Sequence, residues 1–371
     1  MAFLFWPLSC LFSLPKMIFG LLVTLSCVFT LGSVFMGQGW LGSFFTYFRL
    51  QYFAIQLIAF IWATFDFLVL SRRNARTHTA VPRLASWCGL VFLLVSMGLN
   101  LLVILPYYQS ANRLHLPSGE KTLRLVHLNL MGPLNRDFSK VDRLLRDTKP
   151  DMLDFVEYTP LWQRTLEQGY LKRYPYRSVI PGHLAFYSRF PMQAYRRYPR
   201  GMTHVANQAY LLANVRFKKT ILTVLVAHPA SPLTPVRWQW QQALFADWIR
   251  ERSRWNRHLL VVGDLNTAPW TPELVTLMQK TGLRDSQLGF GIQPSWPAIF
   301  PGFKGGESVP FWMFPLGLPI DHILVSSRLD IVSRQAIAFV GSDHLPIVLG
   351  FVIGKNPVLP VSQPFIEKRL R

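Results

Sequence analysis

The sequence predicts an α/β domain with many strands, preceded by a membrane anchor of three helices. Two observations support this prediction. Residues 1–107 contain six basic residues and one acidic residue among otherwise apolar and small side chains, a composition typical of membrane segments. From residue 108 onward, short apolar runs of β-forming residues alternate with helical patterns, which is the order expected of an α/β fold.

Three stretches of the N-terminal part are long enough to cross the hydrocarbon core of a bilayer, which takes about 20 residues. They are residues 18–36, 50–70 and 84–105, and each is free of charge or nearly so. The first could instead be a signal peptide, but no small-residue cleavage site follows it and two more apolar stretches do. Residues 1–107 are therefore predicted to be an anchor of three transmembrane helices, in which Asp66 and Asn100 face other helices.

The distribution of positive charge predicts how the anchor is oriented. The loop at residues 71–76 holds three arginines, with Arg83 just beyond it, whereas the loop between the first two stretches offers only Arg49. Short positively charged loops remain on the cytoplasmic side of a membrane. The N-terminus is then cytoplasmic, and the α/β domain lies in the periplasm, on the outer side of what we expect to be a bacterial inner membrane.

The part of the chain after the anchor is strongly basic. Residues 108–371 contain 33 Lys and Arg against 18 Asp and Glu, a formal charge of +15. Such a charge attracts anions, which leaves nucleic acid, an anionic lipid surface and a phosphorylated small molecule open as partners. All three cysteines, Cys10, Cys27 and Cys88, lie in the anchor, so the basic part has no disulfide-linked partner and no cysteine-based metal site.

Short apolar runs rich in branched residues predict the strands of the α/β domain. They are residues 123–130, 152–156, 185–187, 209–215, 221–227, 259–262, 323–325 and 347–352. Three helices are predicted to begin at Thr-Pro pairs, in which a capping hydroxyl precedes a proline suited to the first turn. Their ranges are 161–171, 236–250 and 273–280. We place a linker at 108–121, the domain at 122–354 and a basic, proline-containing tail at 355–371.

The first candidate for chemistry is Asp264-Leu265-Asn266, which follows the apolar run 259–263. Residues spaced i, i+2 at a strand end point to the same side, so a carboxylate and an amide share one face. The carboxylate can orient or deprotonate an attacking water, and the amide can bond a phosphate oxygen. The structural alternative is an Asp-containing turn that caps the strand.

Two loops near the C-terminus place a histidine beside a carboxylate. They are Asp321-His322 and Asp343-His344, the second within Ser-Asp-His-Leu-Pro. A histidine held by a carboxylate keeps one tautomer and can act on a phosphate or a water. Each loop alone could equally be a surface loop with a satisfied histidine, but their order after Asp264 favours a functional interpretation.

Other strands also end in polar residues. Glu157 closes the run 152–156, Asn129 lies inside the first predicted strand, and His228 follows the run 224–227. The oxygens of the first two suit Mg²⁺ or Mn²⁺. The alternatives are a helix N-terminal acid for Glu157, a strand-end hydrogen bonder for Asn129 and a satisfied core histidine for His228.

Taken in order, these residues resemble the endonuclease/exonuclease/phosphatase (DNase I-like) superfamily, which includes abasic-site nucleases, inositol polyphosphate 5-phosphatases and neutral sphingomyelinases. The resemblance covers residues 122–352, and its most specific pieces are Gly-Asp-Leu-Asn at 263–266 and Ser-Asp-His-Leu-Pro at 342–346. It implies a four-layer α/β sandwich, with two mixed β-sheets flanked by helices and the site at one end. The three transmembrane helices would precede this sandwich.

The resemblance also implies a role for each residue. Asp264 would position or deprotonate the water, Asn266 and His228 would contact the phosphate, and Asp321 would orient His344. The implied ligands and supports of a Mg²⁺ (or Mn²⁺) ion are Glu157, Asn129 and Asp343. The implied reaction is in-line attack of water on a phosphate ester, by a metal-dependent phosphodiesterase, phosphatase or nuclease.

Two positions depart from the family pattern. Phe-Val-Glu-Tyr at 155–158 replaces the usual Gln-Glu pair, and His127 stands where an aromatic or small residue often precedes the asparagine. Neither departure removes a ligand, so we expect an active enzyme. His228 resembles the phosphatase and sphingomyelinase branches more than the abasic-site nucleases. The alternative is a catalytically silent membrane module that binds an anionic partner through its basic face.

An aromatic loop leaves the substrate open between lipid, nucleic acid and phosphorylated metabolite. In the loop at residues 296–320, five aromatic side chains follow Trp296, at 300, 303, 311, 312 and 314. Aromatic side chains suit the headgroup interface, so this loop could contact the outer leaflet or frame a lipid-accepting site. A loop folded over the sheet edge as ordinary core is the alternative.

Overall fold

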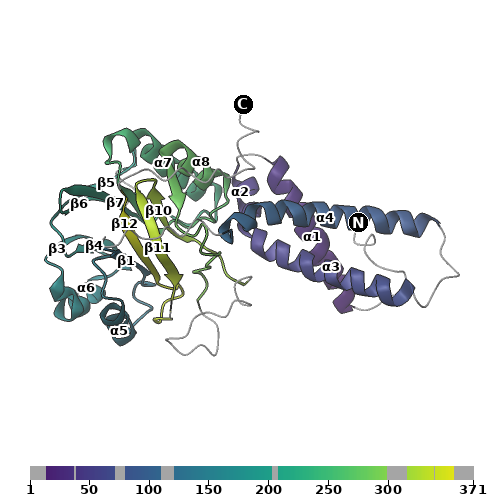
Figure 1. Ribbon diagram of the computed structural model, residues 1–371, viewed down its shortest axis with the longest axis horizontal. Helices are drawn as coiled ribbons and strands as arrows, with labels where there is room; N and C mark the ends of the chain where they lie inside the picture. The colour runs from purple at the N-terminus through teal and green to yellow at the C-terminus, as the bar shows by residue number, and fades with distance from the viewer. Residues whose placement is uncertain are drawn as a thin grey trace. The chain divides into compact units, whose positions relative to one another are not determined.

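The computed structural model describes residues 14–36, 39–71, 80–109, 121–202, 208–298, 316–337 and 339–354 (Figure 1). The chain divides into two compact units, with the boundary between Pro106 and Tyr107. Most of the predicted linker, the greater part of the aromatic loop and the C-terminal tail lie outside the described residues.

The first unit is helical. Its helices are α1 (Leu14–Phe35), α2 (Trp40–Tyr47), α3 (Arg49–Ser71) and α4 (Ala80–Ile104). Within the described residues, Met17–Phe35 and Trp87–Tyr107 are each long and apolar enough to cross a membrane. The pair formed by α2 and Arg49–Phe65 is bent by 54° and makes a third span if it crosses as one element. The short helix α2 was not predicted, because its eight residues fall well below the length of a span.

A buried polar network joins α1, α3 and α4. Asn100 donates through its amide to the Thr30 hydroxyl at 2.9 Å and to Gln56 Oε1 at 3.1 Å. Arg49 donates to Asn100 Oδ1 at 3.2 Å and to the Ser33 hydroxyl at 2.8 Å. Asn100 thus makes the interhelical hydrogen bonds expected of it, whereas the side chain of Asp66 lies outside the described residues.

The second unit contains two six-stranded mixed sheets in its described part. The first sheet has the order β11-β12-β1-β2-β4-β3, with β1 Leu123–Asn129, β2 Met152–Tyr158, β3 Tyr176–Ile180, β4 His183–Ser188, β11 Leu329–Ala336 and β12 Ile347–Ile353. The second has the order β5-β6-β7-β8-β10-β9, with β5 Met192–Arg197, β6 Tyr210–Phe217, β7 Thr220–Ala227, β8 Leu259–Asp264, β9 Leu283–Asp285 and β10 Asp321–Ser326. Each sheet has one central parallel pair, β1 with β2 and β7 with β8.

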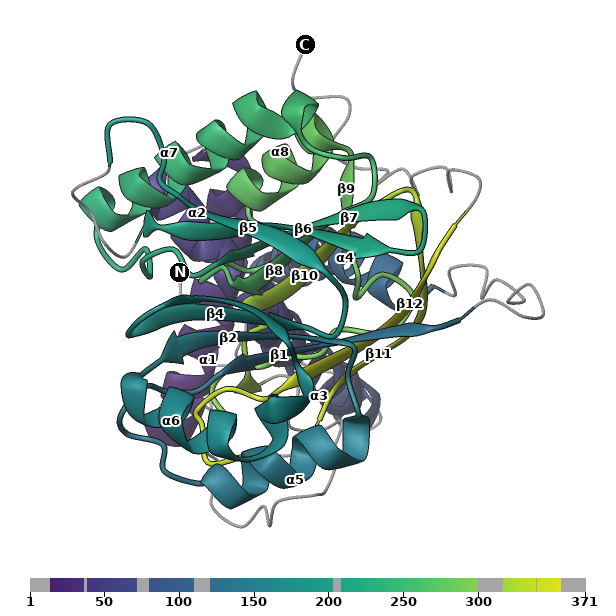
Figure 2. The ribbon, with the colours of Figure 1, turned by 90° about the vertical axis from the view of Figure 1, so that its left-hand side faces the viewer.

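Helices cover the outer face of each sheet, which gives four layers (Figure 2). The helices α5 (Phe138–Thr148) and α6 (Pro160–Gln168) lie on the first sheet, and α7 (Pro235–Glu251) and α8 (Pro272–Thr281) lie on the second. The main core lies between the sheets and draws on alternate residues of both, such as Leu125 from β1 and Val262 from β8. This is the four-layer α/β sandwich that the resemblance implied.

Each of the three predicted Thr-Pro pairs lies at the beginning of a helix, but only two of the threonines cap their helix through the side chain. Thr159 Oγ1 accepts from Trp162 N, and Thr234 Oγ1 accepts from Arg237 N, both at 3.3 Å. Thr271 does not cap α8 in this way, because its hydroxyl donates to Ala268 O at 3.0 Å. That bond instead tightens the loop between β8 and α8.

The second unit begins at Tyr107, the residue predicted to end the anchor. The Tyr107 side chain is buried and packs edge-on against Trp270, with ring centroids 6.1 Å apart. Its carbonyl oxygen accepts from Gly289 N at 3.1 Å and from Gly291 N at 2.8 Å. The last residue of the predicted anchor is therefore part of the α/β unit.

Candidate functional site

Polar residues occupy inward-facing positions where strands of both sheets meet. On β1, Leu123 and Leu125 face the core between the sheets, so alternation places His127 and Asn129 on that same face. In the second sheet, Asp321 at the start of β10 is the direct partner of Asp264 at the end of β8. The inter-sheet layer therefore changes from apolar to polar at one end.

Glu157 reaches this polar end because of a bulge in β2. The pairing of β2 with β4 shifts between Val156 and Tyr158, and Glu157 has a left-handed backbone with φ of 56°. A bulge leaves one residue unpaired and re-aims its side chain. The Asn129 amide lies 3.4 Å from Glu157 Oε1 and donates to Asp264 Oδ2 at 3.1 Å. The three side chains, predicted separately from three strands, thus form one group.

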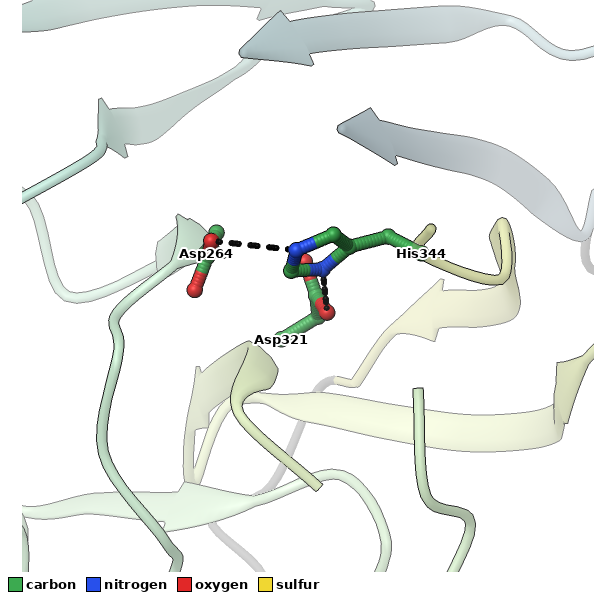
Figure 3. Close-up of side chains that lie close together, drawn as sticks. All are labelled: Asp264, Asp321 and His344. Carbon is green, nitrogen blue, oxygen red and sulfur yellow. Dashed lines mark hydrogen bonds and ion pairs between the residues drawn. The ribbon is translucent and has the colours of Figure 1, made fainter. Parts of the chain in front are cut away.

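His344 lies between two carboxylates (Figure 3). Its Nδ1 donates to Asp321 Oδ2 at 2.7 Å, and its Nε2 faces Asp264 Oδ2 at 3.7 Å. Burial alone lowers the pKa of His344, but Asp321 and Asp264 outweigh that effect and raise it to about 9. The ring is therefore an imidazolium at neutral pH, and its bond to Asp321 fixes its orientation.

The other two predicted phosphate contacts flank Asp264. His228 Nε2 lies 3.5 Å from Asp264 Oδ2, and although burial opposes it, this carboxylate raises the pKa of His228. Asn266 has a left-handed backbone with φ of 50°, and its N–H donates to Asp264 Oδ1 at 2.9 Å. The Asn266 side-chain amide donates to Pro229 O at 3.0 Å, which ties the loop after β8 to the loop after β7.

Asp343 lies apart from the group around Glu157 in its described contacts. Its Oδ2 accepts from Trp296 Nε1 at 3.1 Å, and its carbonyl oxygen accepts from Ala298 N at 2.7 Å. The neighbouring loop histidine, His322, is fully buried and its Nε2 donates to Thr267 O at 2.7 Å. His322 thus supports the loop after β8, while Asp343 braces the start of the aromatic loop.

Sequence reasoning missed two residues that contact the site. His127 was noted only as a departure, and Asp154 was read as part of a buried strand. The His127 ring bonds Asp154 Oδ2 through Nδ1 at 2.5 Å and Asp321 Oδ1 through Nε2 at 2.8 Å. Burial opposes protonation, but the two carboxylates raise the pKa of His127 to about 10. The sequence feature that could have revealed them is a polar residue at an inward-facing position in each of two otherwise apolar strands.

The donor set fits a hard divalent cation. Among the described residues, Asp264, Asp321 and His344 each bring one possible ligand atom within 4.8 Å of the other two. The protonated His344 ring has no free lone pair for a metal, so the oxygens of Glu157 and Asn129, beside Asp264, are the better donors. Glu157 adds a carboxylate that lies close to the backbone of Gly132. A Cβ built on Gly132 would be 3.3 Å from Glu157 Oε2, so a larger residue there would crowd the carboxylate. Carboxylate and amide oxygens with water are the usual surroundings of Mg²⁺.

Comparisons with known proteins place the chain in one family. Residues 126–344 match the model of the Endonuclease/Exonuclease/phosphatase family. No curated protein matches the sequence. Among solved structures, a protein of this family from Bacteroides thetaiotaomicron is 13% identical with a TM-score of 0.50, covering 63% of this chain and 96% of that one.

Two further solved structures are similar at lower TM-scores. A humanized TDP2 from D. rerio is 16% identical with a TM-score of 0.47, covering 62% of this chain and 98% of that one. Sphingomyelinase C from Streptomyces griseocarneus is 13% identical with a TM-score of 0.44, covering 62% and 99%. The family match spans more than half of the sequence and includes the residues from β1 to His344. The chain therefore belongs to the endonuclease/exonuclease/phosphatase family, whose members hydrolyse phosphodiester or phosphate ester bonds and generally use divalent metal ions.

Proposed function

We propose that this protein is a membrane-anchored, Mg²⁺- or Mn²⁺-dependent phosphoesterase that hydrolyses a phosphodiester or phosphomonoester by in-line attack of water. The observation that supports it best is the pair formed by Asp264 and His344. Their side chains face each other at 3.7 Å, and a hydrogen bond of 2.7 Å to Asp321 holds the histidine. A water bound by Asp264 and a phosphoryl group bound by His344 would lie side by side, next to an anionic base and a cationic donor.

Each side chain has a chemical task in this proposal. Asp264 orients the attacking water and accepts its proton. His344 donates from Nε2 to a phosphoryl oxygen and stabilises the charge that develops there, because it is already an imidazolium held in place. Asn266 and His228 bind the remaining phosphoryl oxygens, and Asp321 keeps the His344 ring in one orientation.

The proposed metal ligands are Glu157 and Asn129. Asp343, whose carboxylate accepts from Trp296, would support only the water shell of the metal. A bound divalent ion neutralises charge on the phosphoryl oxygens. The carboxylate of Glu157 lies next to the Asn129 amide and is partly exposed, and a metal ligand must be exposed to solvent for the ion to exchange. Oxygen donors without thiolates favour Mg²⁺ or Mn²⁺ over softer metals.

The apolar helices support a location in a membrane. We place the N-terminus in the cytoplasm and the catalytic unit outside it, because the arginine-rich sequence at 71–76 follows the second apolar stretch. A lipid, a nucleic acid and a phosphorylated metabolite are all compatible with the charge of the catalytic part. Single cysteines introduced at residue 74 and at residue 218, in a variant with Cys10, Cys27 and Cys88 replaced by serine, test this orientation. In intact cells a membrane-impermeant thiol reagent should label residue 218 and not residue 74, and the opposite result would reverse the orientation.

Hydrolysis of bis-p-nitrophenyl phosphate by the full chain in detergent tests the activity. The assay compares Mg²⁺, Mn²⁺ and chelator for the parent and for the variants Asp264→Ala and His344→Ala. His258→Ala is the matched control, because this histidine lies at the opposite end of β8. Metal-dependent turnover that both site variants lose supports the proposal. A folded protein without turnover of this ester or of a panel of lipids and nucleic acids favours the silent binding module.

A further inference from the structure

A buried histidine and carboxylate lie behind the proposed catalytic pair. His127 and Asp154 are in register on β1 and β2, face the layer between the sheets, and have no exposed surface. Taking two ionisable side chains out of water costs several kcal/mol unless they bond each other or further groups. Apolar residues of similar volume usually fill such positions at least as stably. The pair therefore needs a reason beyond packing.

The hydrogen bonds of His127 point to that reason. Its Nε2 lies 2.8 Å from Asp321 Oδ1, while the other oxygen of Asp321 accepts from His344 Nδ1 at 2.7 Å. Each oxygen of Asp321 is thus held by a different imidazole, so the carboxylate cannot rotate without losing one bond. His127 belongs to the first sheet and Asp321 to the second, so this bond also fixes one sheet against the other at the site.

Asp154 completes the arrangement by holding the far side of the His127 ring. Its Oδ2 lies 2.5 Å from His127 Nδ1, and within the described residues its Oδ1 has no hydrogen-bond partner. The Asp154 carboxylate is therefore committed to His127. The four side chains form one line from the first sheet to the site: Asp154, His127, Asp321 and His344.

We infer that His127, held by Asp154, is a positioning residue that fixes the Asp321 carboxylate and thereby sets the orientation of the His344 imidazole toward the substrate. The inference rests on the proposed role of His344. His127 does not touch the substrate in this arrangement. Its loss leaves Asp321 with one free buried oxygen and lets the carboxylate and the His344 ring turn together. His127, which departs from the family pattern, thus adds a positioning side chain to the site.

Two substitutions separate the two bonds of His127. In His127→Gln the amide nitrogen takes the place of Nε2 and can still donate to Asp321, whereas in His127→Asn it takes the place of Nδ1 and can donate only to Asp154. We expect His127→Asn to lower kcat by about 10–100-fold with little change in KM, and His127→Gln to recover most of that loss. His258→Asn is the control for a remote histidine, and all variants are compared as full chains in detergent.

A second readout does not depend on turnover. In protein labelled with ¹⁵N-histidine, the ring signals of His344 should move in His127→Asn and stay close to the parent in His127→Gln. Equal loss of kcat in both variants, or an unmoved His344 signal in His127→Asn, overturns the inference and assigns His127 to packing. If the parent hydrolyses no ester, the proposed function has failed, and the His344 signals still decide whether His127 positions the ring.

A double variant covers the case in which His127→Asn does not fold. His127→Leu combined with Asp154→Leu removes both members of the pair together, which avoids leaving either one buried without its partner. We expect this protein to fold, to show the displaced His344 signal, and to lose kcat by a similar factor. A parent-like kcat and an unmoved His344 signal in the folded double variant would overturn the inference.

Discussion

Gly263 provides the sharpest test of how the site is built. It precedes Asp264 on β8 and has a φ of 148°, and a Cβ at this position would lie 1.8 Å from the Ala227 carbonyl oxygen of β7. Ordinary contact needs about 3.4 Å, so β7 and β8 would have to separate by about 1.6 Å. Backbone strain of about 1–3 kcal/mol and overpacking of about 1–3 kcal/mol add to a loss of about 2–6 kcal/mol for Gly263→Ala. In a domain of this size that lowers Tm by about 4–24 °C.

Thermal unfolding of the full chain in detergent, followed by near-UV circular dichroism, measures this loss. Gly182→Ala is the matched control, because Gly182 also has a positive φ, of 74°, but a Cβ there meets no atom within 4 Å. The control should show only the cost of the backbone conformation. If the two variants unfold at the same temperature, the close approach of β7 and β8 at Gly263 is not what requires glycine. We also expect Gly263→Ala to lower hydrolysis, since Asp264 and His228 follow the two displaced residues.

Three further predictions concern the site itself. The folded-state pKa of His344, about 9, is above its ordinary value of about 6.5. The contribution of His344 to stability is therefore complete below about pH 6.5 and is lost as pH rises through about 9. The rate of ester hydrolysis should fall over the same upper range, and a rate that still climbs at pH 10 contradicts the role of the imidazolium. Asp321→Asn should lower kcat by about 10–100-fold, because His344 loses a charged acceptor. Asp285 forms a buried pair with His322 away from Asp264, so Asp285→Asn should affect Tm more than kcat in the folded protein. Similar kcat values for the two variants would refute the distinction. Chelator should abolish turnover and Mg²⁺ restore it, and Glu157→Gln should raise the Mg²⁺ concentration for half-maximal rate by about 10–100-fold; an unchanged metal titration would remove Glu157 from the metal site.

The sequence was sufficient to predict the strands that are apolar throughout, because buried strands have a strong composition signal. It missed β3, β5, β9 and β11, which are the edge strands of the two sheets. The side chains of β3, β5 and β11 are partly exposed and mixed in polarity, and β9 has only three residues. It also missed α5, which has no Thr-Pro start. Edge strands depend on pairing with a neighbour, and a single sequence does not show that neighbour.

The site residues could be found because each lies at or near one end of a strand, but their contacts could not. Glu157 reaches Asn129 only through a bulge, and no local pattern in β2 predicts one. His127 and Asp154 look like isolated polar residues in apolar strands until the parallel pairing of β1 and β2 sets them side by side. Their link to Asp321 also depends on how two sheets stack, which is a property of the whole domain.

The polar network of the helical unit has a consequence for how the protein is made. Arg49 and Asn100 bond each other across α3 and α4, and Asn100 also reaches Thr30 of α1. Arg49 is buried in the helical unit, and a buried guanidinium is costly unless it is paired, so α3 lacks one of its stabilising partners until α4 is present. Because α4 follows α1 and α3 in the chain, this network can close only after α4 has been made. We expect a variant lacking Asn100 to have a less stable helical unit, whatever the state of its catalytic site.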